Sequence, residues 1–172
     1  MSTSGETLFL PDEAATARLG AALAQALLAE RAAIEHDGFV LGLSGDLGAG
    51  KTALVRATLR ALGERGPVKS PTFALLEPYV VSSLNFYHFD FYRFAQPAEF
   101  VAAGFRELFG AGAVCAVEWP EKAAGALPAA DLAIELQVHG EGRAARLAAA
   151  SDLGVRCLTR VQQEWSTRSA AG

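Results

Sequence analysis

The sequence has 172 residues, a formal net charge of −4 at pH 7 and 51% hydrophobic residues. At ~100–200 residues per domain, this length predicts one domain and excludes an enzyme with separate cofactor and substrate domains, and the composition excludes disordered and collagen-like chains. The acidic balance argues against a protein that binds nucleic acid through bulk positive charge, although it leaves room for a local anion site.

The first half of the chain predicts the order strand, helix, strand, helix. Leu19, Leu23 and Leu27 recur every four residues, which places them on one face of a helix that begins near Pro11 and ends before Gly38. The elements expected here are a strand over Thr7–Leu10, this helix, a fully buried strand over Phe39–Leu43, a glycine-rich turn over Ser44–Gly50 and a helix over Lys51–Leu62 that ends at Gly63.

The second half of the chain predicts mostly strands. Ala113–Val117 is an apolar run typical of a buried strand, and Leu132–Val138 alternates apolar and polar residues as a half-buried strand does. The other elements expected are strands over Leu75–Val81 and Phe86–Phe89, a helical segment over Pro97–Phe109, a loop or short helix over Lys122–Pro128, and a hairpin strand over Arg143–Ala149. This order favours an α/β fold with a mixed sheet flanked by helices.

The strongest motif is a phosphate-binding loop between the buried strand and the second helix. Its glycines allow a tight turn whose backbone N–H groups hold phosphates, and the N-terminus of the following helix adds a favourable dipole. Lys51 is expected to reach the β- and γ-phosphates, and the Thr52 hydroxyl to coordinate magnesium. The nucleotide-binding residues expected are Gly45, Asp46, Leu47, Gly48, Ala49, Gly50, Lys51 and Thr52. The motif predicts a nucleotide-binding α/β domain.

Two carboxylates compete for the second metal anchor that a magnesium–nucleotide site needs. Glu118 follows the buried run Val114–Val117, and Asp90 follows Tyr87–Phe89. A charged residue after a buried strand is also an ordinary strand end. Beside a phosphate loop, the pattern indicates that at least one of the two is functional without choosing between them. His88 is either a proton carrier or a packed histidine.

The cysteines and the apolar segments indicate the compartment. Cys115 and Cys157 are the only cysteines, and neither has a second cysteine or a histidine at metal-ligand spacing, so we expect two buried thiols in a reducing cytosol. Met1–Leu10 lacks the pattern of a signal peptide, and the longest apolar stretch, Ala21–Ala29, is too short to span a bilayer. We therefore expect a soluble cytoplasmic domain with no membrane association.

Taken together, the motifs resemble the bacterial TsaE (YjeE) family, the ATPase component of tRNA threonylcarbamoyladenosine synthesis. After the phosphate loop come Ser70–Phe73, His88–Arg93 and Glu118–Glu121, in the order and approximate spacing of the family. The resemblance extends up to about Leu153 and leaves the end of the chain uncovered. We therefore predict one P-loop ATPase domain over residues 1–158 and a flexible tail over residues 159–172.

The resemblance implies a P-loop fold in three layers, with a mixed and mostly parallel sheet between helices. It also implies slow hydrolysis of ATP with Mg²⁺. By motif match, Lys51 contacts the phosphates, and Thr52 surrounds the magnesium ion together with Glu118 and Asp90. Lys51, Glu118 and Asp90 are thus the expected catalytic residues.

Two further residues and the partners are also implied by the resemblance. Thr72 lies in a switch-like loop, where it is expected to sense hydrolysis. Trp119 is expected either to lie near the nucleotide or to be an ordinary core or surface aromatic residue. In the family, the ATPase acts on a complex of the TsaD and TsaB proteins, which transfers the threonylcarbamoyl group, and hydrolysis is thought to reset that complex. This chain is then expected to meet tRNA only through its partners.

Three alternatives share the phosphate loop. A small-molecule kinase usually closes an arginine-rich lid over the phosphates, whereas Ala123–Ala130 contains no arginine. A GTPase would carry the Asn-Lys-x-Asp signature that reads guanine, which is absent from this sequence. A nucleotide-binding module without turnover is the third alternative.

Overall fold

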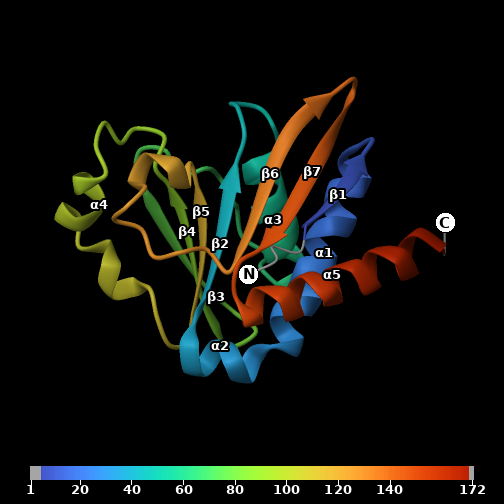
Figure 1. Cartoon of the computed structure of the whole chain (residues 1–172), viewed down its shortest axis with the longest axis horizontal. Helices are drawn as coiled ribbons and strands as arrows, with labels where there is room; N and C mark the ends of the chain where they lie inside the picture. Colours follow the sequence, from blue (N-terminus) through green and yellow to red (C-terminus); the bar gives the residue numbers. More distant parts are fainter. Residues whose placement is uncertain (1–4, 171–172) are drawn as a thin grey trace.

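The structure is a computed structural model that describes residues 5–170 (Figure 1). In chain order its elements are β1 (Gly5–Leu10), α1 (Glu13–Ala29), α2 (Arg31–Asp37), β2 (Phe39–Ser44), α3 (Lys51–Leu62), β3 (Leu76–Val81), β4 (Leu84–Asp90), α4 (Ala98–Ala102), the 3₁₀ helix η1 (Phe105–Leu108), β5 (Ala113–Glu118), the 3₁₀ helix η2 (Pro120–Ala123), β6 (Leu132–His139), β7 (Gly142–Ala149) and α5 (Asp152–Ala170). Residues 1–4 of the segment inspected for a signal peptide, and residues 171–172 of the predicted tail, lie outside the described residues.

One seven-stranded sheet in the order β1-β7-β6-β2-β5-β4-β3 forms the centre of the molecule. β6, β2, β5 and β4 pair in parallel, whereas β7 and β1 at one edge and β3 at the other are added by antiparallel pairing. All strands except β3 and β7 therefore run in the same direction. β5 is buried along its whole length and β2 along nearly all of it, as their apolar runs predict. The predicted α/β class with a mixed, mostly parallel sheet is confirmed.

The sheet separates two cores, which gives the molecule three layers (Figure 1). Because side chains alternate across a strand, Leu41 and Leu43 of β2 face the core that is shared with α1, α3 and α5. Cys115 and Val117 of β5 face a second, aromatic core beneath α4 and the 3₁₀ helices. Within residues 5–170, none of the helices has the length and apolar character that crossing a membrane requires.

The two long helical segments predicted from the sequence are both interrupted. The segment between Pro11 and Gly38 forms α1 and α2, which meet at Glu30. The carboxylate of Glu30 is buried against α5, so a tertiary contact overrides the apolar periodicity. The segment over Pro97–Phe109 is divided into α4 and η1 by Gly104, whose φ of 75° lies in the left-handed region.

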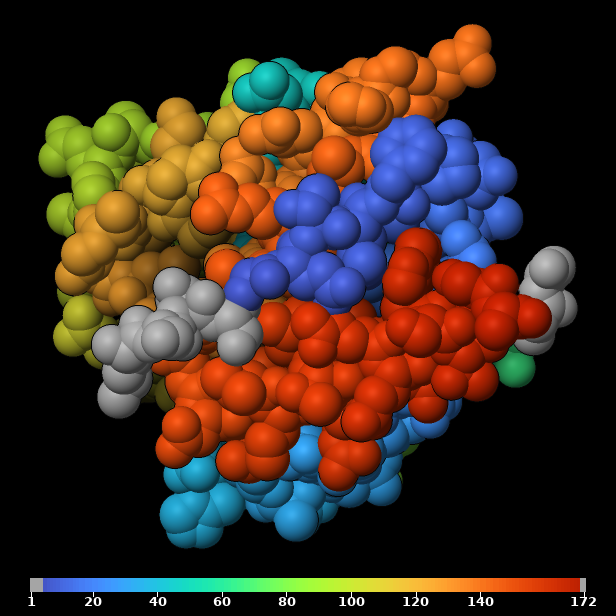
Figure 2. Space-filling view, turned by 45° about the vertical axis from the view of Figure 1, so that its right-hand side comes forward, coloured from blue at the N-terminus to red at the C-terminus, as the bar shows by residue number. Residues whose placement is uncertain are grey.

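Residues 159–170 form the second half of α5, so the prediction of a flexible tail is wrong for these residues. α5, red in Figure 2, lies across the molecule between the N-terminal elements and α2. Leu158 and Val161 are buried in the core, and Trp165 packs against it with the Arg18 guanidinium 4.7 Å from its ring centroid. Spacings of three and four residues place these side chains on one helix face, which explains why the helix continues.

A buried carboxylate ties α5 to the junction of α1 and α2. Arg156 Nε donates to Glu30 Oε2 at 3.0 Å, and Arg160 Nε donates to Glu30 Oε1 at 2.9 Å. The hydrogen bond from Arg160, followed by that from Arg156, holds the pKa of Glu30 below its ordinary value of 4.5, although burial acts in the opposite direction. The charged form of Glu30 therefore stabilises the folded state.

This pairing predicts a pH-dependent stability difference between the wild type and Glu30→Gln. Because the pKa is lowered on folding, the stabilisation is fully present above pH 4.5 and is lost as the pH falls through the lower folded-state value. The wild type should melt at a higher temperature than Glu30→Gln at pH 7, and thermal melts should show this gap closing below pH 4.5. Glu35→Gln, an exposed carboxylate on α2, is the control. A gap that does not change with pH would contradict the prediction.

The two cysteines are buried and unpaired, as their spacing predicts. Burial raises the pKa of Cys115 to about 12, and the pKa of Cys157 is likewise raised to about 12. Both thiols are therefore protonated at neutral pH in the folded protein, where they act as small apolar side chains rather than as nucleophiles.

Candidate functional site

The functional side chains predicted from the sequence meet at one edge of the sheet. The loop after β2 lies next to the last residues of β5 and β4, which are Glu118 and Asp90. Glu118 is in register with Leu43 on β2 and with Asp90 on β4. Parallel pairing therefore places both candidate carboxylates at the carboxyl edge of the sheet, where open α/β sheets bind their ligands.

The loop between β2 and α3 has a backbone suited to an anion. Gly45, Gly48 and Gly50 have φ values of 138°, 78° and 106°, which side chains rarely tolerate. At Gly45 an added Cβ would also lie 2.3 Å from the carbonyl oxygen of Leu136 on β6. α3 begins at Lys51 as predicted, and the N–H groups of its first turn have no acceptor within the helix. These groups can bind phosphate oxygens.

Lys51 is buried within this loop. Its Nζ donates hydrogen bonds to the carbonyl oxygens of Gly45 and Asp46, the latter at 2.9 Å, and lies 4.4 Å from the centroid of the Trp119 ring. The backbone N–H of Trp119 donates to the carbonyl oxygen of Leu43 at 3.1 Å, which fixes the residue beside β2. The structure thus places the Trp119 indole over the ammonium group of the phosphate loop.

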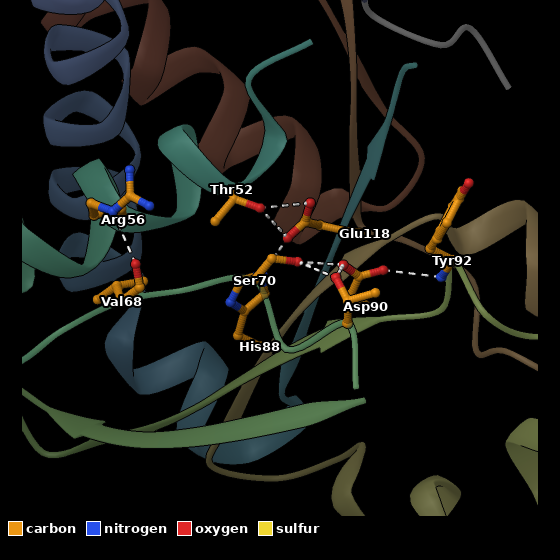
Figure 3. Close-up of polar contacts among 9 residues, drawn as sticks. Thr52, Arg56, Val68, Ser70, His88, Asp90, Tyr92 and Glu118 are labelled. Atoms are coloured by element: carbon orange, nitrogen blue, oxygen red, sulfur yellow. Dashed lines mark hydrogen bonds and ion pairs between the residues drawn. The ribbon is translucent and has the colours of Figure 1, made fainter. Parts of the chain in front are cut away.

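Glu118 joins the phosphate loop to β4 (Figure 3). The Thr52 hydroxyl donates to its carboxylate and lies 3.0 Å from Oε1 and 2.9 Å from Oε2. On the opposite side, His88 Nε2 lies 2.6 Å from Glu118 Oε2, and both side chains are buried. His88 Nδ1 is buried without a hydrogen-bond partner in the described part of the chain. Of the two predicted carboxylates, Glu118 is the one that contacts Thr52.

Asp90 anchors the loop that precedes β3 (Figure 3). The hydroxyls of Ser70 and Thr72 both donate to Asp90 Oδ2, Thr72 at 3.0 Å, and the backbone N–H of Tyr92 donates to Oδ1 at 3.0 Å. Asp90 therefore holds the switch-like segment Ser70–Phe73 against the end of β4. Its partners are Ser70, Thr72 and Tyr92, whereas those of Glu118 are Thr52 and His88.

The rim of the site carries two exposed apolar side chains. Leu47 on the phosphate loop is 65% exposed, and Phe73 in the switch-like segment is 81% exposed. The guanidinium carbon of Arg93 lies 4.0 Å from the centroid of the Phe73 ring. Apolar and charged surface therefore lie together around the phosphate loop.

Arg143, near the start of β7, is a site residue to which the sequence pattern assigned no role. Its Nε donates to the carbonyl oxygen of Ala49 at 3.0 Å, and its Nη2 donates to that of Gly48 at 3.2 Å. The sequence signal is the pair Gly142–Arg143, which is also part of the resemblance to the family; at Gly142 an added Cβ would lie 2.5 Å from the carbonyl oxygen of Leu10. This glycine allows β1 and β7 to meet closely at the point from which Arg143 projects.

A groove of about 920 Å³ opens beside the phosphate loop. It lies between the start of α1, the exposed face of α3 and the start of β7, and Pro11, Thr16, Gly50, Arg56 and Arg143 are among its lining residues. Clefts of ~300–1,000 Å³ are the size that small-molecule ligands occupy. The groove and the loop together form a continuous site at this edge of the sheet.

The oxygens near the loop fit a magnesium ion that is bound together with phosphates. Within the range 5–170, there is no group of three or more His, Cys, Asp or Glu side chains that could hold a metal ion. Magnesium is usually held by one or two protein carboxylates with substrate phosphates and water. The Thr52 hydroxyl and the Glu118 carboxylate offer suitable oxygens side by side.

Comparisons with known proteins agree with this geometry. The family model for the threonylcarbamoyl adenosine biosynthesis protein TsaE matches residues 10–146. The chain is 40% identical over 156 residues to the tRNA threonylcarbamoyladenosine biosynthesis protein TsaE of Haemophilus influenzae, which covers 89% of this chain and 95% of that protein. It is 38% identical over 110 residues to the protein of the same name from Bacillus subtilis, covering 64% of this chain and 68% of that protein.

A solved structure has a similar fold. The crystal structure of YdiB from Bacillus subtilis matches with a TM-score of 0.76 and 24% sequence identity, covering 95% of this chain and 97% of that chain. The matched family region contains the phosphate loop, both carboxylates and Arg143. The chain therefore belongs to the TsaE family of threonylcarbamoyl adenosine biosynthesis proteins.

Proposed function

We propose that this chain binds and hydrolyses ATP with Mg²⁺, and that hydrolysis drives or resets the TsaB–TsaD complex that forms threonylcarbamoyladenosine next to the anticodon of tRNAs. The observation that carries the proposal is the glycine-rich loop over Gly45–Gly50, with Thr52 bonded to Glu118 at the start of α3. This arrangement supplies backbone N–H groups, a cation and metal-binding oxygens in one place.

The residues of the site divide the work on the phosphates. The N–H groups at the start of α3 bind phosphate oxygens. Lys51 gives up its hydrogen bonds to the carbonyl oxygens of Gly45 and Asp46 and binds the β- and γ-phosphates instead. Thr52 and Glu118 would hold Mg²⁺, which neutralises phosphate charge when it is bound. His88 Nε2 bonds to Glu118 Oε2 on the side away from Thr52, so this carboxylate is already oriented before the nucleotide binds. Asp90 holds Thr72 beside the site.

The groove beside Gly50 is our candidate site for the adenine base and the ribose. It begins where the phosphate loop ends and is lined by apolar surface from α1 and α3 as well as by Arg56 and Arg143. A base can bury its faces there while the phosphates remain on the loop, because Gly50 belongs to both the groove and the loop, and Arg143 lines the groove and bonds to the loop.

Partners would cover the rim of the site. TsaE takes part in threonylcarbamoyladenosine biosynthesis, and the side chains of Leu47 and Phe73 are exposed next to the loop and the switch-like segment. A partner that packs on these side chains senses the state of the nucleotide directly. We therefore propose TsaB and TsaD as the proteins that accelerate hydrolysis, with tRNA bound by them.

The decisive experiment measures threonylcarbamoyladenosine formed on tRNA by TsaB and TsaD with a threonylcarbamoyl donor and ATP. With the wild-type chain we expect many molecules of product per molecule of TsaD. With Lys51→Met we expect about one, because the phosphates of ATP lose the mobile cation that binds them. Lys69→Met, an exposed lysine, is the matched control and should behave as wild type. Nucleoside analysis by chromatography gives the yield.

Undiminished multiple-turnover product without this chain would overturn the role in the cycle. ATP binding, measured separately by calorimetry on the chain alone, distinguishes failure of that role from failure of nucleotide binding. ADP release that requires a small-molecule acceptor, and neither TsaB nor TsaD, would indicate a kinase instead.

A further inference from the structure

The guanidinium of Arg143 bonds to two consecutive residues of the phosphate loop and lies beside a third. Nε donates to the carbonyl oxygen of Ala49 at 3.0 Å, and Nη2 donates to that of Gly48 at 3.2 Å. Nε also lies 3.8 Å from the position that a Cβ on Gly50 would take. A third donor, Nη1, binds the carbonyl oxygen of Gly142 at 3.0 Å. Backbone carbonyls therefore fix the guanidinium from the loop and from its own strand.

These bonds set the direction in which the peptide groups of the loop face. In a trans peptide, the C=O of one residue and the N–H of the next point in opposite directions. Because the carbonyls of Gly48 and Ala49 turn toward Arg143, the N–H groups of Ala49 and Gly50 turn away from it. The Ala49 N–H closes the turn by donating to the carbonyl oxygen of Asp46 at 3.0 Å. The Gly50 N–H points away from Arg143, and it is the group that we expect to meet a phosphate.

Lys51 cannot supply this support while a phosphate is bound. Its Nζ bonds to the carbonyl oxygens of Gly45 and Asp46, and it must leave them to reach a phosphate. Arg143 contacts a different pair of carbonyls and can stay in place. Its positive charge then remains against carbonyl oxygens that would otherwise be free to turn toward the anion and repel it.

We propose that Arg143 is a positioning residue for phosphate binding, which holds the carbonyls of Gly48 and Ala49 outward so that the N–H of Gly50 faces the anion. The inference rests on the proposed binding of ATP and adds a residue that acts through the loop. The planar guanidinium reaches two carbonyls with two separate nitrogens, whereas the single nitrogen of a lysine reaches one well. Shape as well as charge is therefore required at this position.

The test compares Arg143→Met and Arg143→Lys with Arg146→Met, a change of an exposed arginine on the same strand. The full-length chain is titrated by calorimetry with Mg²⁺–ATP and, separately, with inorganic tripolyphosphate, which has no base or ribose. Arg143→Met should weaken the binding of both ligands, including tripolyphosphate, on the order of 10- to 100-fold. Arg143→Lys should weaken both nearly as much, and Arg146→Met should bind as the wild type does.

The other possible results show whether the inference or the proposed function is wrong. If Arg143→Met binds both ligands as the wild type does, the inference is overturned and the proposed function is untouched. If Arg143→Met weakens the binding of ATP but not of tripolyphosphate, Arg143 acts on the base or ribose, and the inference is overturned. If Arg143→Lys binds both ligands as the wild type does, charge alone suffices, and the inference is overturned as well. A wild-type chain that binds neither ligand overturns the proposed function itself. Should Arg143→Met fail to melt cooperatively, Arg143→Lys carries the same comparison of the two ligands.

Discussion

Replacing Glu118 by glutamine is expected to slow partner-stimulated ATP hydrolysis about 100-fold, because a fixed charge at the reacting phosphates is lost. Glutamine has nearly the same shape and can still accept a hydrogen bond from Thr52. It removes the negative charge that lies between Thr52 and His88. The rate of phosphate release at saturating ATP should fall, while the affinity for ATP measured by calorimetry changes much less.

Glu121→Gln is the matched control for this experiment. Glu121 lies three residues further along the chain, is exposed on η2, and should tolerate the same change without loss of rate. A wild-type rate in Glu118→Gln, with a large loss in Asp90→Asn, would reverse the assignment of the two carboxylates. Asp90 would then be the one that acts on the metal.

Removing residues 159–172 is expected to lower the free energy of unfolding by roughly 3 kcal/mol or more. Val161 is fully buried, and losing a side chain of this size from a core costs about 1.5–3 kcal/mol. The hydrogen bond from Arg160 to the buried Glu30 carboxylate is lost as well, at a further cost of about 1.5–3 kcal/mol. For a chain of this length the melting temperature should fall by about 10 °C, measured by calorimetry.

A shorter truncation separates the core contacts from the exposed end of α5. Removal of the residues after Thr167 takes away exposed positions over the described residues 168–170 and the surface ion pair between Arg168 and Glu164, which is worth little. That variant should melt close to the wild type. Equal melting temperatures for the full-length chain and the chain ending at Leu158 would show that the C-terminal half of α5 adds no stability.

Local patterns predicted the parts of the molecule that local chemistry determines. The apolar runs at β2 and β5 identify buried strands because both faces of a central parallel strand are covered. The range of α3 follows from the glycines at either end, Gly50 and Gly63, which both adopt left-handed φ values. The Thr52–Glu118 contact follows from the rule that parallel strands end at one edge of a sheet.

Contacts between residues far apart in the chain could not be predicted in this way. The break between α1 and α2 depends on Arg156 and Arg160, which lie more than a hundred residues beyond Glu30. The contact of Arg143 with the phosphate loop depends on the order of the strands, in which β7 returns beside β6. The resemblance to the family does not reach the end of α5, and only the packed fold shows that Val161 and Trp165 have a core to join.

The position of β1 has a consequence for protein synthesis. β1 leaves the ribosome long before β7, which is the strand that pairs with it in the described sheet. A growing chain must keep β1 unpaired until β7 has been made, because this contact joins residues that lie far apart in the sequence. Arg143 lies on that same partner strand. If Arg143 positions the phosphate loop as proposed, this loop is complete only once the sheet is closed.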